Sequence, residues 1–341
     1  MTSSPSSPPT TRATSTASVG VVVCTHRAER LPELLEAVAS LRRQQLPPTS
    51  VLVVVDEGPD LERQVRSALA DLATDADPAA DDADAATDAA GPPVRVLGLG
   101  RNRGVSIART EGARALDTDL VAFLDDDAVA HPDWLAVLAD VLVDSAVLGA
   151  GGRSDAVFLA PRPRWLPEEF LWTVGCSYRG QPRTRARVRN VYGGCALLRR
   201  EVFVDLGGFH PEIGHRDGFS GGGEEAEFCL RASAATGGVF AYEPATGIDH
   251  RVPGWRLTWR YYLGRCVAEG RMKARLARLG PGSTLGPERS FAVRLPVAIV
   301  RYLLAPPAGV GRSAAFGVVA GGLAVTVGMM LDAVAVRGGR R

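Results

Sequence analysis

Apolar runs alternate with amphipathic segments along the first third of the chain. The apolar runs, each expected to form a strand, are 19–24, 51–55, 94–97 and 120–124. The segments with apolar residues at helical spacing, each expected to form a helix, are 31–44, 60–72 and 105–116. Strands that are buried on both faces lose the period-two alternation of half-exposed sheets. The pattern therefore predicts an α/β fold with a doubly wound, mostly parallel sheet and helices on both faces.

The expected elements become irregular after residue 151. Several prolines surround Trp165, and beyond them we expect a strand over 195–198 and a helix over 224–235. Past Arg251 the pattern is helical, and its basic or apolar segments are 257–279, 291–304 and 314–331. The chain is therefore expected to end in a C-terminal extension that is helical, basic and apolar.

Two segments lack the large apolar residues that a packed element needs. Residues 1–18 are rich in Ser, Thr and Pro, and residues 73–93 consist mainly of Ala, Asp, Thr and Pro. We expect a disordered tail and a disordered acidic loop, because neither segment can bury enough surface to order itself. The remaining chain is expected to divide into 19–150, 151–255 and 256–341.

The charges are divided unevenly along the 341 residues, although 39 basic and 38 acidic side chains nearly balance. Residues 251–341 contain 15 Lys or Arg and 3 Asp or Glu. The first 250 residues contain 24 Lys or Arg and 35 Asp or Glu. A basic C-terminal part suits an anionic lipid surface, and the acidic clusters elsewhere argue against nucleic acid. The five cysteines form no CxxC pair, which favours reduced thiols in the cytoplasm over disulfides.

Polar residues follow each predicted strand, at the edge where open parallel sheets bind ligands. The most distinctive are three consecutive carboxylates, Asp125, Asp126 and Asp127, after the fourth strand. Adjacent carboxylates repel one another, and a divalent cation relieves the repulsion. Mg²⁺ or Mn²⁺ commonly takes one or two carboxylates together with substrate phosphates, so the run predicts a metal and diphosphate site.

The chain resembles the family 2 glycosyltransferases of the GT-A fold over about residues 19–255. The resemblance is carried, in family order, by VVVCTHRAERLPELLEAV, VLVVVDEGPD, NRGVSIARTEG, VAFLDDDAVAHPDWL, VYGGCALLRREVF, GGGEEAEFCLR and YEPATGIDH. It implies an inverting, metal-dependent transfer from a nucleotide sugar. Residues 19–150 would bind the donor, and 151–255 would bind the acceptor and supply the base. Residues 256–341 lie beyond the resemblance, and their basic and apolar composition predicts association with a membrane.

The resemblance also implies roles for individual residues on the donor side. Thr25 and Arg27 would flank the nucleotide, and Asp56 would hydrogen-bond its base. Arg109 would lie near the diphosphate. Asp125 and Asp127 would be the DxD pair, with Asp125 toward ribose or sugar and Asp127 on the metal. Asp126 would be a further donor-binding residue. Asp125 would also be a candidate metal ligand, and His250 would contact the metal or the diphosphate.

Glu225 is the candidate general base, with Glu224 and Gly194 on the acceptor side. Glu225 follows three glycines and lies in the first turn of a predicted helix, where the helix dipole favours the ionised carboxylate. The Glu224–Glu225 pair replaces the family's usual Glu-Asp, and Cys195 stands where Asn is frequent. The QxxRW sequence of processive synthases is missing, which favours a single transfer per encounter.

Two other interpretations stay open on the residues alone. Gly98, Gly100 and Gly104 follow a strand and precede a helix, as in an NAD(P)-dependent oxidoreductase. Alternatively, the basic C-terminal part could belong to a non-enzymatic membrane adaptor. Asp126 and Asp127 would set like charges beside a dinucleotide ribose, so glycosyl transfer is the preferred interpretation.

The expected partners are a nucleotide-sugar donor, with UDP preferred, and a hydroxylated acceptor that is lipid-linked, part of the cell envelope or small. The uncharged run 314–331 is near the minimum of about 17 residues for a membrane span. We therefore expect peripheral or integral attachment at the cytoplasmic face of a membrane. Trp255, Trp259, Tyr261 and Tyr262 are expected to act as interfacial anchors.

Overall fold

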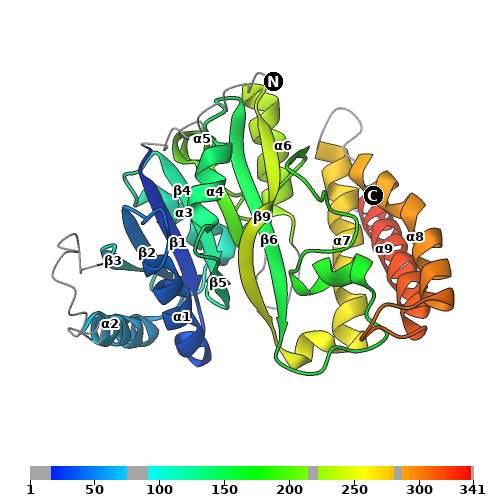
Figure 1. The fold of residues 1–341 in the computed structure, drawn as a ribbon. Helices are drawn as coiled ribbons and strands as arrows, with labels where there is room; N and C mark the ends of the chain where they lie inside the picture. The colour runs from blue at the N-terminus through cyan, green and yellow to red at the C-terminus, as the bar shows by residue number, and fades with distance from the viewer. Residues whose placement is uncertain (1–16, 75–90, 214–221, 280–285, 339–341) are drawn as a thin grey trace, which may run out of the picture.

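The computed structural model describes residues 17–74, 91–213, 222–279 and 286–338. Most of the predicted tail and most of the predicted acidic loop lie outside these residues. At the start of the described chain, the Ser18 hydroxyl donates to Asp119 at 2.8 Å. The fold is a mixed α/β sheet with helices on both faces and a helical C-terminal extension at one end (Figure 1).

The first part of the chain folds as its apolar pattern predicts. Its elements are β1 (Val19–Thr25), α1 (Leu31–Arg42), β2 (Ser50–Val55), α2 (Pro59–Thr74), β3 (Val94–Gly98), α3 (Val105–Arg114) and β4 (Leu120–Asp125). The four strands pair in parallel. Val21 and Val23 of β1 enter one hydrophobic core and Val22 enters the other, so burial on both faces accounts for the unbroken apolar run.

The second part contains two long strands that the sequence analysis missed. Its elements are β5 (Ala128–Ala130), α4 (Trp134–Val141), β6 (Val147–Phe158), β7 (Ala186–Val188), β8 (Cys195–Arg199), α5 (Arg200–Asp205), α6 (Glu224–Thr236) and β9 (Val239–Val252). β6 and β9 pair in parallel with two register irregularities. Their sequences contain Gly, Pro and charged residues, so long-range pairing overrides a weak local signal.

One sheet connects the two parts. Within the described residues the strand order is β3-β2-β1-β4-β8-β6-β9-β5, with β7 paired to β9. Residue 150, an expected boundary, lies inside β6, which pairs with both β8 and β9. The predicted parallel arrangement holds for β1 to β4, whereas β8 pairs antiparallel with β4 and β6. The sheet is therefore mixed rather than mostly parallel.

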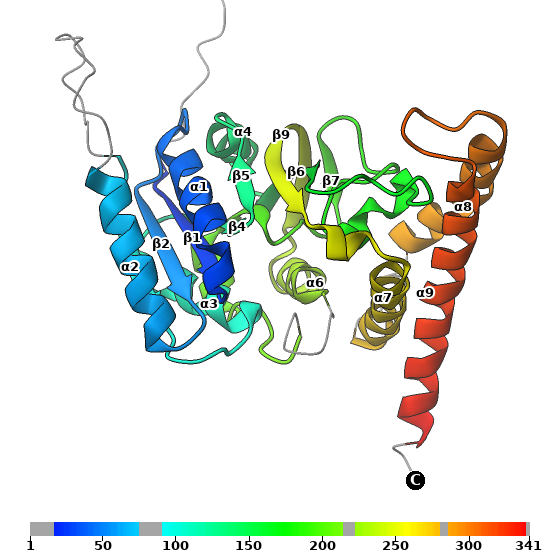
Figure 2. The ribbon, with the colours of Figure 1, turned by 90° about the horizontal axis from the view of Figure 1, so that it is seen from below.

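The C-terminal extension consists of three helices around a third hydrophobic core. They are α7 (Trp259–Leu279), α8 (Gly286–Leu304) and α9 (Ser313–Gly338), and they lie beyond β6 and β9 in both ribbon views (Figure 2). Tyr262 is buried in this core and Trp259 stacks on Trp165 at 4.0 Å, so neither is a free interfacial anchor. Among the described residues, α9 alone is long and apolar enough to cross a membrane.

Candidate active site

The predicted metal ligands meet where β4, β5 and β9 adjoin. β4 ends at Asp125, and the pairing of Ala128 in β5 with His250 in β9 brings that histidine beside Asp127. Nδ1 of His250 lies 3.3 Å from Oδ1 of Asp127. Ligand atoms of Asp125, Asp127 and His250 all lie within 4.8 Å of one another. Two carboxylates and an imidazole at this spacing suit a divalent cation.

An arginine that the sequence analysis did not single out neutralises part of the aspartate run. Arg30 ends the short helix η1 (Ala28–Arg30), and its Nη1 lies 2.5 Å from Oδ1 of Asp126 and 3.0 Å from Oδ2 of Asp127. Burial raises the pKa of Asp126 to about 6, although Arg30 opposes the shift. Burial acts on Asp127 too, but its hydrogen bond with His250 and the nearby positive charges keep its pKa well below the usual value.

His250 is engaged through both ring nitrogens. Arg256, in the short helix η3 (Gly254–Leu257), places Nη1 3.0 Å from Nε2 of His250. A guanidinium can only donate, so Nε2 accepts, and a neutral imidazole then carries its proton on Nδ1, facing Asp127. For His250 to bind a cation through Nδ1, the proton must leave that nitrogen. If it moves to Nε2, Arg256 must release the ring.

A second charged cluster lies on the other side of Asp125. Arg109 of α3 is buried and donates from Nη2 to Oδ1 of Asp125 at 2.7 Å. Its Nη1 lies 3.6 Å from Oε1 of Glu224 and 3.5 Å from Oε1 of Glu225, at the start of α6. Arg109 therefore joins the aspartate run to the glutamate pair.

The two glutamates differ in burial and in protonation. The side chain of Glu224 is 3% exposed and that of Glu225 is 21% exposed. Burial, together with the charge of Glu225, raises the pKa of Glu224 to about 8. Oε1 of Glu225 accepts the backbone N–H of Gly193 at 3.1 Å. Of the pair, Glu225 is the glutamate that the backbone orients and that solvent can reach.

The glycines before β8 bring the main chain against both clusters. A Cβ on Gly194 would lie 2.2 Å from Oδ2 of Asp125, and a Cβ on Gly193 would lie 2.4 Å from Oε1 of Glu225. A side chain at either position would displace a carboxylate of the site. The sequence analysis named Gly194 but not Gly193, although the consecutive glycines before a predicted strand were the available signal.

Asp56 anchors the glycine-containing loop that leads into α3. Its two carboxylate oxygens accept the backbone N–H groups of Arg103 and Gly104 at 2.7 and 2.8 Å. Burial raises the pKa of Asp56, and these two hydrogen bonds oppose the shift. The loop follows β3 at the edge of the sheet, whereas strand order reverses between β1 and β4. This placement does not suit a dinucleotide site, which lies where the order reverses.

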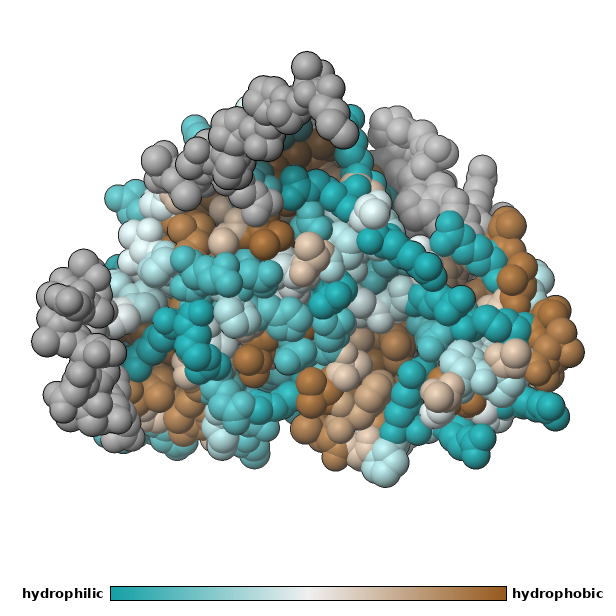
Figure 3. Space-filling model, in the orientation of Figure 1, coloured by the Kyte–Doolittle hydropathy of each residue, from teal (hydrophilic) through white to brown (hydrophobic). Residues whose placement is uncertain are grey.

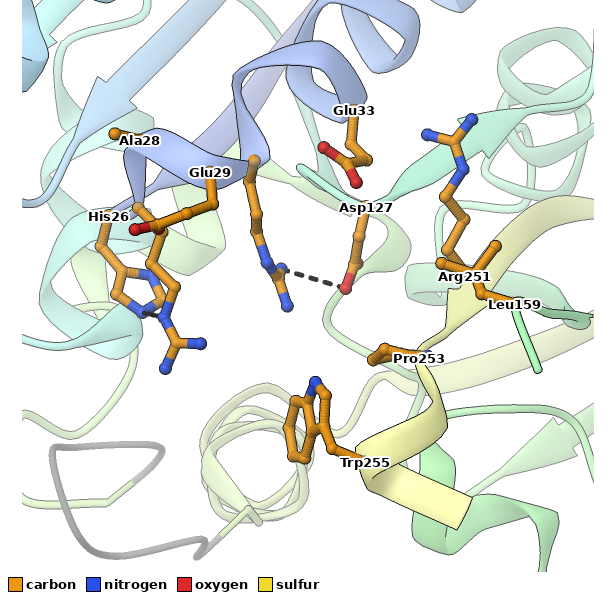
Figure 4. Close-up of a pocket in the computed structure, with 11 residues that line it drawn as sticks. His26, Ala28, Glu29, Glu33, Asp127, Leu159, Arg251, Pro253 and Trp255 are labelled. Atoms are coloured by element: carbon orange, nitrogen blue, oxygen red, sulfur yellow. Dashed lines mark hydrogen bonds and ion pairs between the residues drawn. The ribbon is translucent and has the colours of Figure 1, made fainter.

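A cavity of about 670 Å³ opens against Asp127. Its wall includes Arg27 and Arg30 from the segment after β1, and Arg251 and Trp255 from the end of β9 and η3. Figure 4 shows Glu33 and Trp255 on opposite sides of Asp127. Thr25 is buried at the end of β1, just before this segment. The predicted residues Arg27 and Asp127 therefore line the cavity together with Arg30, Arg251 and Trp255, whereas Thr25 does not.

Comparison with known proteins gives a family match and two long alignments to curated relatives. Residues 20–207 match the family model described as Glycosyl transferase family 2. A glucosyl-dolichyl phosphate glucuronosyltransferase of Haloferax volcanii is 31% identical over 264 residues, which are 77% of this chain and 78% of the relative. The succinoglycan biosynthesis protein ExoM of Rhizobium meliloti is 27% identical over 261 residues, or 76% and 74% of the two chains.

Two solved structures share the fold. A mannosyltransferase from Pyrobaculum calidifontis, in complex with GDP-Man and Mn²⁺, superposes with a TM-score of 0.53 at 18% identity. That alignment covers 94% of this chain and 86% of the other. GalNAc-T7 with UDP, GalNAc and Mn²⁺ gives a TM-score of 0.50 at 16% identity, covering 81% of this chain and about half, 54%, of its own length. At these identities the likeness concerns the fold.

Proposed function

The chain belongs to glycosyl transferase family 2 and is a glycosyltransferase, and we propose that it transfers one sugar per encounter, with inversion, to a hydroxyl group. The observation that carries the proposal is that Arg109 contacts both Asp125 and Glu225. This arginine connects Asp125, part of the group that suits a cation, to Glu225, the solvent-reachable carboxylate. An inverting displacement needs a leaving diphosphate on one side of the anomeric carbon and a base on the other.

The donor half of the site uses the aspartate run and the arginines around it. Asp125, Asp127 and His250 would hold Mg²⁺ or Mn²⁺, because their ligand atoms converge and their donor set suits a hard cation. The cation would stabilise the negative charge of the departing diphosphate. Arg27 and Arg30, in the cavity wall beside Asp127, supply guanidinium groups that suit phosphate oxygens.

Glu225 is proposed as the general base that takes the proton of the acceptor hydroxyl. Its hydrogen bond from Gly193 and its contact with Arg109 keep the carboxylate oriented. Glu224 suits this role less, since it is buried and its raised pKa keeps it protonated near neutral pH. Glu224 instead fills the space behind Arg109 and limits the negative charge there.

The proposals for the nucleotide and the acceptor rest on Asp56 and on the substrates named for the relatives. Asp56 can accept from N3–H of a pyrimidine through a lone pair not used by the loop, which suits a UDP-sugar, although N1–H of guanine offers the same donor. The Haloferax volcanii relative is named for a dolichyl phosphate substrate and the Rhizobium meliloti relative for succinoglycan. We therefore propose a lipid-linked or cell-envelope acceptor at the cytoplasmic face of a membrane.

Metal-dependent thermal shift with UDP-, GDP- and dTDP-sugars tests the donor half. A ligand at about 100 times its dissociation constant adds ~2.7 kcal/mol to the free energy of unfolding. We expect a clear rise in Tm with one nucleotide class and Mn²⁺ or Mg²⁺ together, and its loss in Asp127→Ala, which should still fold. An equal rise in Asp127→Ala, or full sugar transfer in excess chelator, would contradict the metal assignment.

A further inference from the structure

Most of the large apolar side chains that the described residues leave exposed gather on α8 and α9. They are Val293, Val297, Val300, Leu303 and Leu304 on α8, and Phe316, Val319, Leu323, Val327, Met330, Leu331 and Val334 on α9. We call this set the C-terminal apolar face. In the space-filling view, hydrophobic residues mark the edge of the molecule where α8 and α9 lie (Figure 3). Soluble monomers rarely expose apolar patches this extended without a partner for them.

The spacing shows that each helix exposes one stripe. On α9 the exposed residues recur every three or four positions, from Phe316 through Leu323 to Val334. Thr326, an exposed polar residue between these positions, donates its hydroxyl to the carbonyl of Gly322 at 3.0 Å. Since α8 packs against α9, both stripes lie on one pair of packed helices. The face is therefore broad, apolar and free of exposed acidic groups at these positions.

The side of α9 opposite this stripe packs against α7. A Cβ on Gly328 would lie 2.1 Å from the carbonyl oxygen of Val267, so the two helices pack backbone to backbone there. Asp332 is buried and accepts from Nε of Arg275 at 3.1 Å and from Arg278. Crossing a bilayer alone would strip Asp332 of both partners, at a high cost in hydrocarbon. The packing therefore favours contact through one face over a span.

Charge identifies the occupant of this face. Residues 251–341 carry 15 Lys or Arg against 3 Asp or Glu, and Arg294 and Arg312 are exposed close to the apolar stripes. Such an excess of one sign repels a second copy of the chain and attracts anionic headgroups. We propose that the C-terminal apolar face lies in the plane of an anionic bilayer, with α9 parallel to the surface.

This inference rests on the proposed function, because it places the site beside the membrane that would hold a lipid-linked acceptor. The start of α7 links the two regions. Trp259 contacts Phe316 of the apolar face with ring centroids 5.5 Å apart, and Tyr261 contacts Trp255 of the cavity wall at 5.2 Å. Docking through the face therefore brings the cavity wall close to the headgroups.

Vesicle flotation of the full chain tests the docking. We expect the protein to float with vesicles of mixed phosphatidylglycerol and phosphatidylcholine. Val297→Glu combined with Leu323→Glu should lower the bound fraction about tenfold or more, since two apolar contacts are lost and two negative charges are placed against anionic headgroups. Val143→Glu is the matched control, because Val143 is 60% exposed but lies outside the face. It should float like the wild type.

Two outcomes would overturn the docking proposal. One is equal flotation of the wild type and the double variant. The other is a lipid-free dimer in light scattering that the double variant abolishes, since this would assign the face to a second copy. Donor-induced thermal shift of the double variant separates this proposal from the function, because it should stay unchanged whether or not flotation is lost.

Probe accessibility distinguishes a surface helix from a span. The nitrobenzoxadiazole fluorophore is attached to Phe316→Cys and, separately, to Val334→Cys, with the unsubstituted protein controlling for native thiols. Dithionite added outside sealed vesicles should reduce the fluorophore at both positions to the same extent if α9 lies flat. Protection of one end only, as expected for a helix that crosses the bilayer, would overturn the in-plane arrangement.

Discussion

Arg30 stands at the point where the site's negative charge is densest. Asp126 and Asp127 share its guanidinium, while Asp125 turns to Arg109 instead. Each carboxylate of the run thus has a cationic partner before any metal binds. The arrangement implies that a divalent cation competes with, or displaces, part of an existing set of ion pairs.

Arg30→Gln should increase the response of the protein to metal. Without the guanidinium the three aspartates repel one another more strongly, so Tm in chelator should fall and the rise on adding Mn²⁺ should exceed that of the wild type. Differential scanning calorimetry with and without Mn²⁺ measures both. Arg63→Gln is the control, because Arg63 pairs with Asp60 on the open surface. Equal Mn²⁺ responses in Arg30→Gln and the wild type would contradict the account.

Glu224 should make stability fall as pH rises from about 4.5 to about 8. Its pKa is raised in the folded protein from 4.5 to about 8, so between these values the folded chain keeps a proton that the unfolded chain has lost. The free energy of unfolding should therefore drop by roughly 2 kcal/mol between pH 6 and pH 8. Glu224→Gln should remove that drop. Urea titrations of the wild type and Glu224→Gln at pH 6 and pH 8 measure this difference. If the free energy of unfolding changed by the same amount in both proteins, Glu224 would be ionised at both pH values and the prediction would be wrong.

The helices of the C-terminal extension are positioned by glycines at particular points. Gly328 faces the backbone of Val267, whereas a Cβ on Gly322 would meet Leu295 only at an ordinary 3.7 Å. The same substitution should therefore have opposite effects at the two positions. Gly322→Ala should stabilise by up to ~1 kcal/mol through helix propensity, and Gly328→Ala should destabilise by about 1–3 kcal/mol because α7 and α9 must separate.

Chemical denaturation of the two glycine variants measures this difference. Unchanged stability in Gly328→Ala would mean that α9 does not pack on α7 as described, and a loss of stability in Gly322→Ala would mean that Leu295 of α8 leaves no room for the added methyl group. The result also bears on the membrane arrangement, since a loosely held α9 would be free to rearrange in a bilayer.

The elements that the sequence predicted are those with strong local patterns. β1, β2 and β4 are unbroken apolar runs, and their ends place Asp56 and Asp125 at the same edge of the sheet. β6 and β9 were missed because Gly, Pro and charged residues interrupt them and only their mutual pairing makes them strands. Local sequence cannot reveal a strand that depends on a partner about 90 residues away.

The same limit applies to the site. Asp127 and Glu225 stand in motifs and could be named from the sequence, as could the strand that ends just before Asp127 and the helix that contains Glu225. Arg30 and Arg256 could not be named. Arg30 contacts Asp126, which is 96 positions away, and Arg256 contacts His250, which is 6 positions away; no spacing rule predicts either contact. Arginines are also common in this chain, so one more near a loop carried no signal of its own.

At the scale of the whole molecule, the three largest hydrophobic cores among the described residues have different roles. Two cover the faces of the sheet and fix the strand ends that carry the charged residues, and the third holds the helical extension. The acidic part of the sequence and the basic part meet at Asp127 and Arg256, where the sheet joins η3. The proposed donor site and the proposed membrane face therefore lie close together in the molecule.

The most direct measurement of the central claim is the steady-state and binding analysis of Glu225→Gln. If Glu225 is the base of an inverting transfer, kcat should fall about 10²- to 10⁴-fold while donor affinity by calorimetry stays nearly unchanged. Glu227→Gln is the matched control, because Glu227 lies in the same turn of α6 but pairs with Arg231. It should retain activity. Retained turnover in Glu225→Gln would contradict the claim, and a loss confined to Glu224→Gln would move the base to that residue.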